Sequence, residues 1–150
     1  SWARGQSWAV YGLALCYHYT HEEAILPLFE RVTKYFIDHL PEDYVPYWDL
    51  IFSDGSCEPR DTSAAAIAAC GILEMEKYYH NQEFLDIAKK MMSSLSEKYT
   101  TVDYLQSNGI IKDGMYSRKH GHKSECTSWG DYFYLEALMR MKKSDWKIYW

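Results

Sequence analysis

The opening stretch SWARGQSW holds the residues whose types and spacing best suit ligand binding. Arg4 carries a planar fork of N–H donors that matches a carboxylate, and Trp2 and Trp8 offer flat apolar faces on which a sugar ring can stack. The alternative is structural, with Trp8 packed in a helical core and Arg4 bound to a helix terminus elsewhere. The residues alone leave both interpretations open.

Two further motifs, CEPRDTSAAA and CTSWGDYF, each lead into an apolar stretch. In the first, Asp61, Thr62 and Ser63 are all suitable helix N-caps. In the second, Ser128 and Asp131 have the spacing of a capping box. We therefore expect Asp61 and Asp131 to have structural rather than catalytic roles.

The polar loop KHGHKSEC contains His120, His122 and Cys126, which are residue types that bind zinc. One thiol and a crowded His-x-His pair, with no fourth ligand of matching spacing, argue against a metal site. The loop is better suited to contact a substrate through His122, Lys123 or Ser124. The chain also has no Gly-rich phosphate loop and no GxSxG elbow, so nucleophilic catalysis is not expected.

Hydrophobic periodicity predicts an all-α chain of five helices that position these motifs. The third and fifth are apolar on nearly every side, as buried helices are, whereas the second and fourth carry one apolar stripe. Long segments, 41–61 and 100–128, follow the second and fourth helices, and tight turns follow the first and third. Inner helices thus alternate with outer ones, and the motifs lie where the inner helices begin. The predicted helices are Gln6–Tyr19, Glu22–Leu40, Thr62–Tyr79, Gln82–Tyr99 and Trp129–Met141.

Composition argues against several classes of protein. A formal net charge of -5 gives no electrostatic basis for binding nucleic acid. No apolar run reaches the ~18 residues of a membrane helix, and no signal peptide is evident. Cys16 and Cys70 lie in apolar helical stretches, typical of reduced core thiols, which favours a cytoplasmic location. The 6 Trp and 14 Tyr exceed what a helical core needs and indicate a ligand cleft.

Three segments, in this order and spacing, resemble the C-terminal portion of the unsaturated glucuronyl hydrolases of glycoside hydrolase family 88. They are WARGQSWAVYG, VPYWDLIF followed by PRDTSAAAIAACGILEM, and SWGDYFYLEALMR. The resemblance implies an (α/α)6 barrel with alternating inner and outer helices, of which residues 1–150 form a C-terminal segment of about half or less. Unsaturated rhamnogalacturonyl hydrolases rank second, because they typically have Asn where this chain has Gln6. A non-catalytic helical-repeat binding module is the remaining alternative.

The resemblance also implies a reaction. The family removes 4,5-unsaturated uronic acid from the non-reducing end of lyase-generated oligosaccharides, here of glycosaminoglycan type, by hydrating the vinyl ether without a metal or cofactor. Trp2, Arg4 and Trp8 match substrate-pocket residues, and His122 matches a residue near the aglycone. In some members this loop reads a sulfate on the neighbouring sugar, a chemistry that Lys123 and Ser124 suit.

No residue of this chain matches the family's two key aspartates, so the resemblance assigns no catalytic residue here. The segment alone is therefore expected to be inactive, and its partner is the preceding part of the barrel. Without that part, inner helices would expose apolar surface, and we expect the chain to self-associate.

Overall fold

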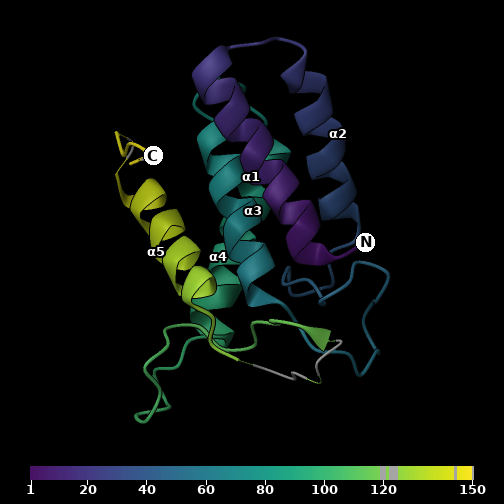
Figure 1. Cartoon of the computed structure of the whole chain (residues 1–150), viewed down its shortest axis with the longest axis vertical. Coiled ribbons are helices and arrows are strands. Elements are labelled where there is room, and N and C mark those ends of the chain that lie inside the picture. Colours follow the sequence, from purple (N-terminus) through teal and green to yellow (C-terminus); the bar gives the residue numbers. More distant parts are fainter. Residues whose placement is uncertain (119–120, 122–124, 144, 150) are drawn as a thin grey trace.

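Five α-helices make up the regular structure of the computed structural model, which describes residues 1–118, 121, 125–143 and 145–149. In Figure 1, α1, α3 and α5 lie side by side, with α2 packed on α1 and α4 packed on α3. The predicted all-α class is confirmed. The helices are α1 (Ala3–Thr20), α2 (Ile25–Asp38), α3 (Thr62–Met75), α4 (Gln82–Lys98) and α5 (Ser128–Lys142).

Three helix boundaries differ from the prediction by three residues or more, and one of them is the start of the second helix at Ile25 rather than Glu22. The first helix begins at Ala3 rather than Gln6, which places the Arg4 side chain in its first turn. The third ends at Met75 rather than Tyr79, because the N–H groups of both Tyr78 and Tyr79 donate to the Met75 carbonyl at 2.9 Å, which tightens the chain into a turn.

The predicted arrangement of connections is confirmed. Short turns join α1 to α2 and α3 to α4 at one end of the molecule, while the long segments 39–61 and 99–127 gather at the other end (Figure 1). Isolated antiparallel backbone pairs hold the long segments, among them Trp2 with Asp49 and Tyr47 with Arg60. The N-termini of α1, α3 and α5 therefore meet the long segments at the same end.

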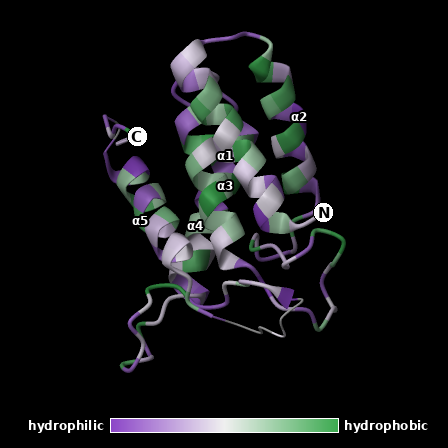
Figure 2. Cartoon of the chain, viewed as in Figure 1, coloured by the Kyte–Doolittle hydropathy of each residue, from purple (hydrophilic) through white to green (hydrophobic). Residues whose placement is uncertain are grey.

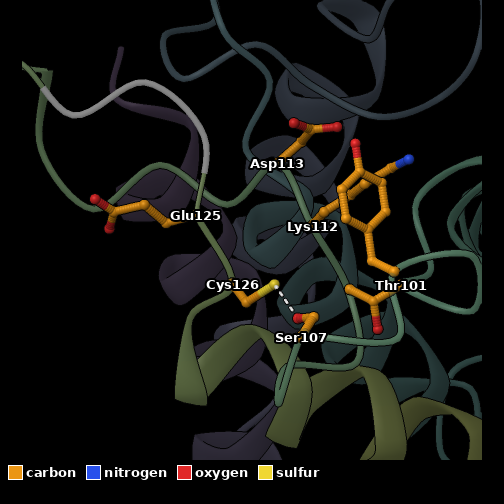
Figure 3. A pocket seen from close by; sticks show the side chains of 7 residues that line it. Thr101, Ser107, Lys112, Asp113, Glu125 and Cys126 are labelled. Atoms are coloured by element: carbon orange, nitrogen blue, oxygen red, sulfur yellow. Dashed lines mark hydrogen bonds between the residues drawn. The ribbon is translucent and has the colours of Figure 1, made fainter.

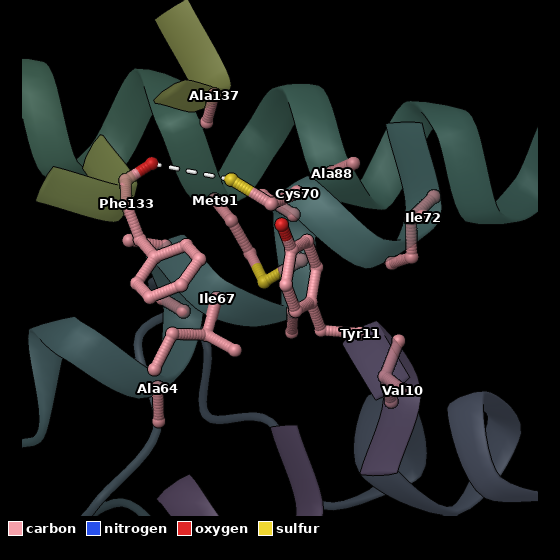
Figure 4. Close-up of a cluster of buried hydrophobic side chains, with 14 of the residues drawn as sticks. Val10, Tyr11, Ala64, Ile67, Cys70, Ile72, Ala88, Met91, Phe133 and Ala137 are labelled. Atoms are coloured by element: carbon pink, nitrogen blue, oxygen red, sulfur yellow. Dashed lines mark hydrogen bonds between the residues drawn. The ribbon is translucent and has the colours of Figure 1, made fainter. Parts of the chain in front are cut away.

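Helix α3 forms the centre of the core, and Figure 2 shows its mainly apolar surface. Its residues are buried on every side except at Leu73. Gly71 allows a close approach to α1, because a Cβ there would lie 2.8 Å from the backbone N and Cα of Tyr11. On the other side, the Cys70 thiol donates to the Phe133 carbonyl of α5 at 3.2 Å (Figure 4).

A buried ionic cluster joins the same three helices nearer the short-turn end. Arg140 donates to Glu136 at 2.9 Å and also to Glu74, and the Tyr11 hydroxyl donates to Glu136 at 3.1 Å. Burial acts to raise the pKa of Glu74, but hydrogen bonds from Lys77 and Arg140 outweigh it and leave that pKa lowered. The cluster keeps α1, α3 and α5 in a fixed register far from the long segments.

The face of α5 turned away from α3 is apolar and uncovered. Tyr132, Leu135, Leu138 and Met141 recur every three residues along it, and Leu135 is 47% exposed. At 3.6 residues per turn, each of these side chains is offset by about 60° from the one before it, so together they form a band that winds partly around the helix. The apolar surface expected on an inner helix is thus present on α5.

The two cysteines expected in the core have different environments. Cys70 is fully buried, as predicted, but Cys16 is exposed and that prediction is wrong. Cys16 follows Trp8 by eight residues and so shares the face of α1 that carries this exposed indole. None of the helices in the described residues is both long and apolar enough to span a bilayer.

The close approach at Gly71 gives a stability prediction with an internal control. Gly71→Ala should lower the free energy of unfolding by about 2 kcal/mol, because the new methyl group meets the α1 backbone. Gly12→Ala should raise it by about 0.5–1 kcal/mol, since a Cβ at this helical site has open space. Urea unfolding followed by circular dichroism measures both, and equal effects of the two changes would contradict the packing account.

Candidate functional site

The Arg4 side chain joins the three chain segments that meet at the long-loop end. It is only 5% exposed, and its Nη1 and Nη2 atoms donate to the carbonyls of Met115 and Tyr116 at 2.7 and 3.0 Å. Nη1 also lies 3.3 Å from Oδ2 of Asp61. One guanidinium thus links the start of α1, the residue before α3 and the segment 99–127.

Two aromatic rings lie against this guanidinium. Its Cζ lies 4.9 Å from the ring centroid of Trp2 and 5.0 Å from that of Trp129, within cation–π range. Tyr116 continues the row, with its ring centroid 5.9 Å from that of Trp129. Gly5 makes room for the first indole, because a Cβ there would lie 2.9 Å from the Trp2 ring. We call this row of flat side chains, Trp2, Arg4, Trp129 and Tyr116, the wall.

Asp61 is the buried counter-charge of this wall. It occupies the N-cap position of α3, but its carboxylate forms no capping hydrogen bond and is fully buried. Oδ1 accepts from the Ser63 hydroxyl at 2.5 Å and from the Met115 N–H at 3.4 Å. Burial raises the pKa of Asp61, and the Arg4 charge acts in the opposite direction. Asp61 thus forms an ion pair with Arg4 rather than the predicted cap, and its structural rather than catalytic role stays a prediction.

The capping box predicted for Ser128 and Asp131 is wrong. Thr127 is the N-cap of α5, and its hydroxyl accepts a backbone N–H of that helix. Asp131 instead accepts the N–H groups of Ile110 and Ile111, both at 3.0 Å. This carboxylate fixes the segment 99–127 against α5, so its role is structural by a different contact.

A hollow of about 560 Å³ lies against the exposed side of this wall. Trp2 is 48% exposed and lines the hollow, whereas Trp8, 37% exposed, packs edge-on against Phe133 with centroids 5.1 Å apart. The structure therefore brings Trp2 and Arg4 together and places Trp8 further along α1. The lining residues are Trp2, Trp48, Met115, Tyr116, Ser117 and Arg118.

A second hollow, of about 450 Å³, is lined by residues of the segments 101–113 and 125–126 (Figure 3). Thr101, Ser107, Lys112 and Cys126 line it, and the Cys126 sulfur lies 3.7 Å from the Ser107 hydroxyl. A third hollow, of about 470 Å³, adjoins both because it shares one lining residue with each. The long-loop end thus carries a chain of three polar and aromatic hollows.

The loop residues predicted to contact substrate, His122, Lys123 and Ser124, lie outside the described residues, as does His120. Cys126 is described and exposed. Within 1–118, 121, 125–143 and 145–149, no three His, Cys, Asp or Glu side chains gather as metal ligands.

Three aromatic residues of the site were not singled out from the sequence. Trp129 and Trp48 stand inside the motifs quoted above, and Tyr116 follows a stretch without a recognisable motif. The sequence offers one signal, a tryptophan in each of the segments SWARGQSW, VPYWDLIF and CTSWGDYF. Their contacts with Arg4 and Trp2 join residues more than 40 positions apart, which periodicity does not reveal.

Residues 1–144 match the family model described as Glycosyl Hydrolase Family 88. The chain belongs to glycoside hydrolase family 88. It is 45% identical over 156 residues to an unsaturated chondroitin disaccharide hydrolase of Streptococcus agalactiae, covering 100% of this chain and 39% of that protein.

Crystal structures from the family have the same arrangement of helices. The unsaturated glucuronyl hydrolase of S. agalactiae matches with a TM-score of 0.94 at 45% identity, over 100% of this chain and 39% of that one. The enzyme of Bacillus sp. GL1 matches with a TM-score of 0.89 at 37% identity, over 96% of this chain and 40% of that one. The family 88 chain thus spans about two fifths of the length of these relatives.

The Arg4–Asp61 pair gives a prediction for a double-mutant cycle. Arg4→Met or Asp61→Asn alone leaves a buried group without its partner and should cost roughly 3 kcal/mol of unfolding free energy. The double variant should lose less than the sum by about 1 kcal/mol or more, as coupled residues do. Urea unfolding measures all four proteins, and strictly additive losses would show that the two side chains are not coupled.

Proposed function

We propose that this chain is the C-terminal segment of an (α/α)6-barrel glycoside hydrolase that removes 4,5-unsaturated uronic acid from glycosaminoglycan-type oligosaccharides. The observation that carries the proposal is the stack of Trp2, Arg4 and Trp129 beside a hollow at the long-loop end. Two relatives support it, since one is named for unsaturated chondroitin disaccharides and another is described as responsible for glycosaminoglycan degradation. In this proposal residues 1–150 belong to one catalytic domain.

In the proposed reaction an acid protonates C4 of the vinyl ether, water adds at C5, and the hemiketal collapses to release the next sugar. This differs from displacement between two carboxylates. Trp2 and Trp8 are proposed to supply faces for the unsaturated ring. Arg4 is proposed to lie beside its carboxylate, although the guanidinium already binds Asp61 and two backbone carbonyls. His122, Lys123 and Ser124 are proposed to contact the leaving sugar.

We propose that the general acid lies in the preceding part of the barrel. Asp61 is fully buried against Arg4, and Asp131 is engaged by two backbone N–H groups, so neither is placed to reach a sugar. The proposal needs no metal and no cofactor. Its other partner is the part of the barrel that supplies the acid.

Gln6 has a packing role. It is the position at which the unsaturated rhamnogalacturonyl hydrolases typically have Asn. Its Nε2 donates to the Val32 carbonyl of α2 at 3.1 Å and so ties an inner helix to an outer one. A shorter Asn would need a different spacing of these helices to make the same contact. Preference for glycosaminoglycan products rests on the names of the relatives.

Activity is tested by the ultraviolet absorbance of the unsaturated uronate, which disappears on hydration. The chain alone should give no turnover, and the chain joined to the residues that precede it in its gene should be active. In that longer protein Trp2→Ala should raise KM about tenfold by removing a stacking face, while Tyr19→Ala, at the opposite end, should not. Turnover by the chain alone would mean that its own residues include the acid.

If Arg4→Ala left sugar binding by the longer protein unchanged, a helical-repeat scaffold would be the better explanation.

The exposed apolar residues of α5 give a prediction about self-association. The chain alone should elute as oligomers on size-exclusion chromatography, and Leu135→Lys should shift it toward monomer. Lys89→Ala on α4 serves as the surface control, and a monomeric unmodified chain with cooperative melting would refute the expectation.

A further inference from the structure

We propose that Trp48 is the stacking platform for the second sugar ring of the substrate, and that Glu58 is its positioning residue. The inference rests on the proposed function, because it concerns the sugar that leaves when the unsaturated uronate is released. Neither residue was singled out from the sequence, and both belong to the long segment 39–61.

The backbone fixes Trp48 beside Trp2. The Ala3 N–H donates to the Trp48 carbonyl at 3.0 Å, and the Trp48 N–H donates to the Pro59 carbonyl at 3.0 Å. Trp2 itself forms an antiparallel pair with Asp49. Three stretches of chain therefore run side by side, and the two indoles are carried by neighbouring stretches.

Side-chain contacts hold the Trp48 indole as well. Its Nε1 donates to Oε2 of Glu58 at 2.8 Å, and its ring lies 5.7 Å from that of Phe52. Glu58 Oε2 also lies 3.4 Å from Nε of Arg118, which lines the same hollow. One carboxylate thus holds two lining side chains, and an indole fixed at its polar edge presents its apolar surface at little entropic cost.

The size and lining of the hollow fit two rings rather than one. Its volume of about 560 Å³ lies within the range of sites for drug-sized ligands. Two chain segments each contribute an indole, Trp2 and Trp48, to its lining. If Trp2 contacts the unsaturated ring, Trp48 remains for its neighbour. The third hollow adjoins this one at Arg118, so it offers room for further sugars of a longer oligosaccharide substrate.

Glu58 also sets the charge that the second sugar meets. The Arg118 guanidinium is paired with this carboxylate, which offsets its attraction for an anionic substituent. Glu58→Gln keeps an oxygen that accepts the Trp48 N–H but removes the negative charge. Glu58→Ala removes both, so the two variants separate the positioning of Trp48 from the electrostatic effect on Arg118.

The test uses the chain joined to the residues that precede it in its gene, and two substrates. One is the methyl glycoside of the unsaturated uronate, which has no second ring, and the other is an unsaturated disaccharide. Trp48→Ala should raise KM for the disaccharide about five- to tenfold with little change in kcat, and should leave the methyl glycoside unaffected. Tyr19→Ala, an exposed aromatic at the short-turn end, is the matched control.

The Glu58 variants test the positioning role with a readout that loss of folding would not give. Glu58→Ala should raise KM for the disaccharide in the same direction as Trp48→Ala. Glu58→Gln should keep KM for the unsulfated disaccharide within about twofold and lower KM for a sulfated one, because Arg118 is no longer paired.

Equal losses on both substrates in Trp48→Ala, or no loss on either, would overturn the inference while the proposed function stands. Failure of the unmodified longer protein to convert either substrate would overturn the proposed function and the inference together. A rise in KM for the sulfated disaccharide in Glu58→Gln would overturn the role given to Glu58.

Discussion

The loop end of this molecule depends on the burial of one guanidinium. Arg4 is nearly inaccessible, so its charge requires Asp61, and its donors require the carbonyls of Met115 and Tyr116. A buried charge without such partners would cost several kcal/mol. The start of α1, the start of α3 and the distant segment 99–127 must therefore assemble together, and the indoles that flank Arg4 are brought into place by the same event.

Much of the fold follows from the sequence because helix periodicity is a local property. The five helices, their alternation and the ends at which the long segments lie all come from apolar spacing and the positions of turns. The exact helix limits differ where local backbone hydrogen bonds tighten the chain into a turn, as after Met75. Cys16 was misplaced because an apolar neighbourhood in the sequence does not say which face of an inner helix has a neighbour.

The site was only partly predictable. The types of Trp2 and Arg4 indicated stacking and anion binding, and these roles stay predictions. The structure shows that the Arg4 donors bind two backbone carbonyls next to the Trp2 ring, contacts that the sequence did not reveal. Asp61 and Asp131 were predicted to cap helices, but their contacts join residues 57 and 21 positions apart, which no capping rule describes. Trp48 reaches the hollow through backbone pairing of two irregular segments, a geometry without a sequence pattern.

The close contact at Gly71 affects the position of the wall formed by Trp2, Arg4, Trp129 and Tyr116. At Gly71 the two helices approach so closely that a Cβ would lie 2.8 Å from the Tyr11 backbone. Arg4 stands seven residues before Tyr11, which is about 10 Å along a helix axis. A methyl group at position 71 would push α1 and α3 apart at this contact and change the angle between them. The resulting displacement grows with distance along each helix, and it would therefore reach the start of α1. The alignment of the indoles with the buried ion pair is thus set partly by the atoms that a glycine lacks.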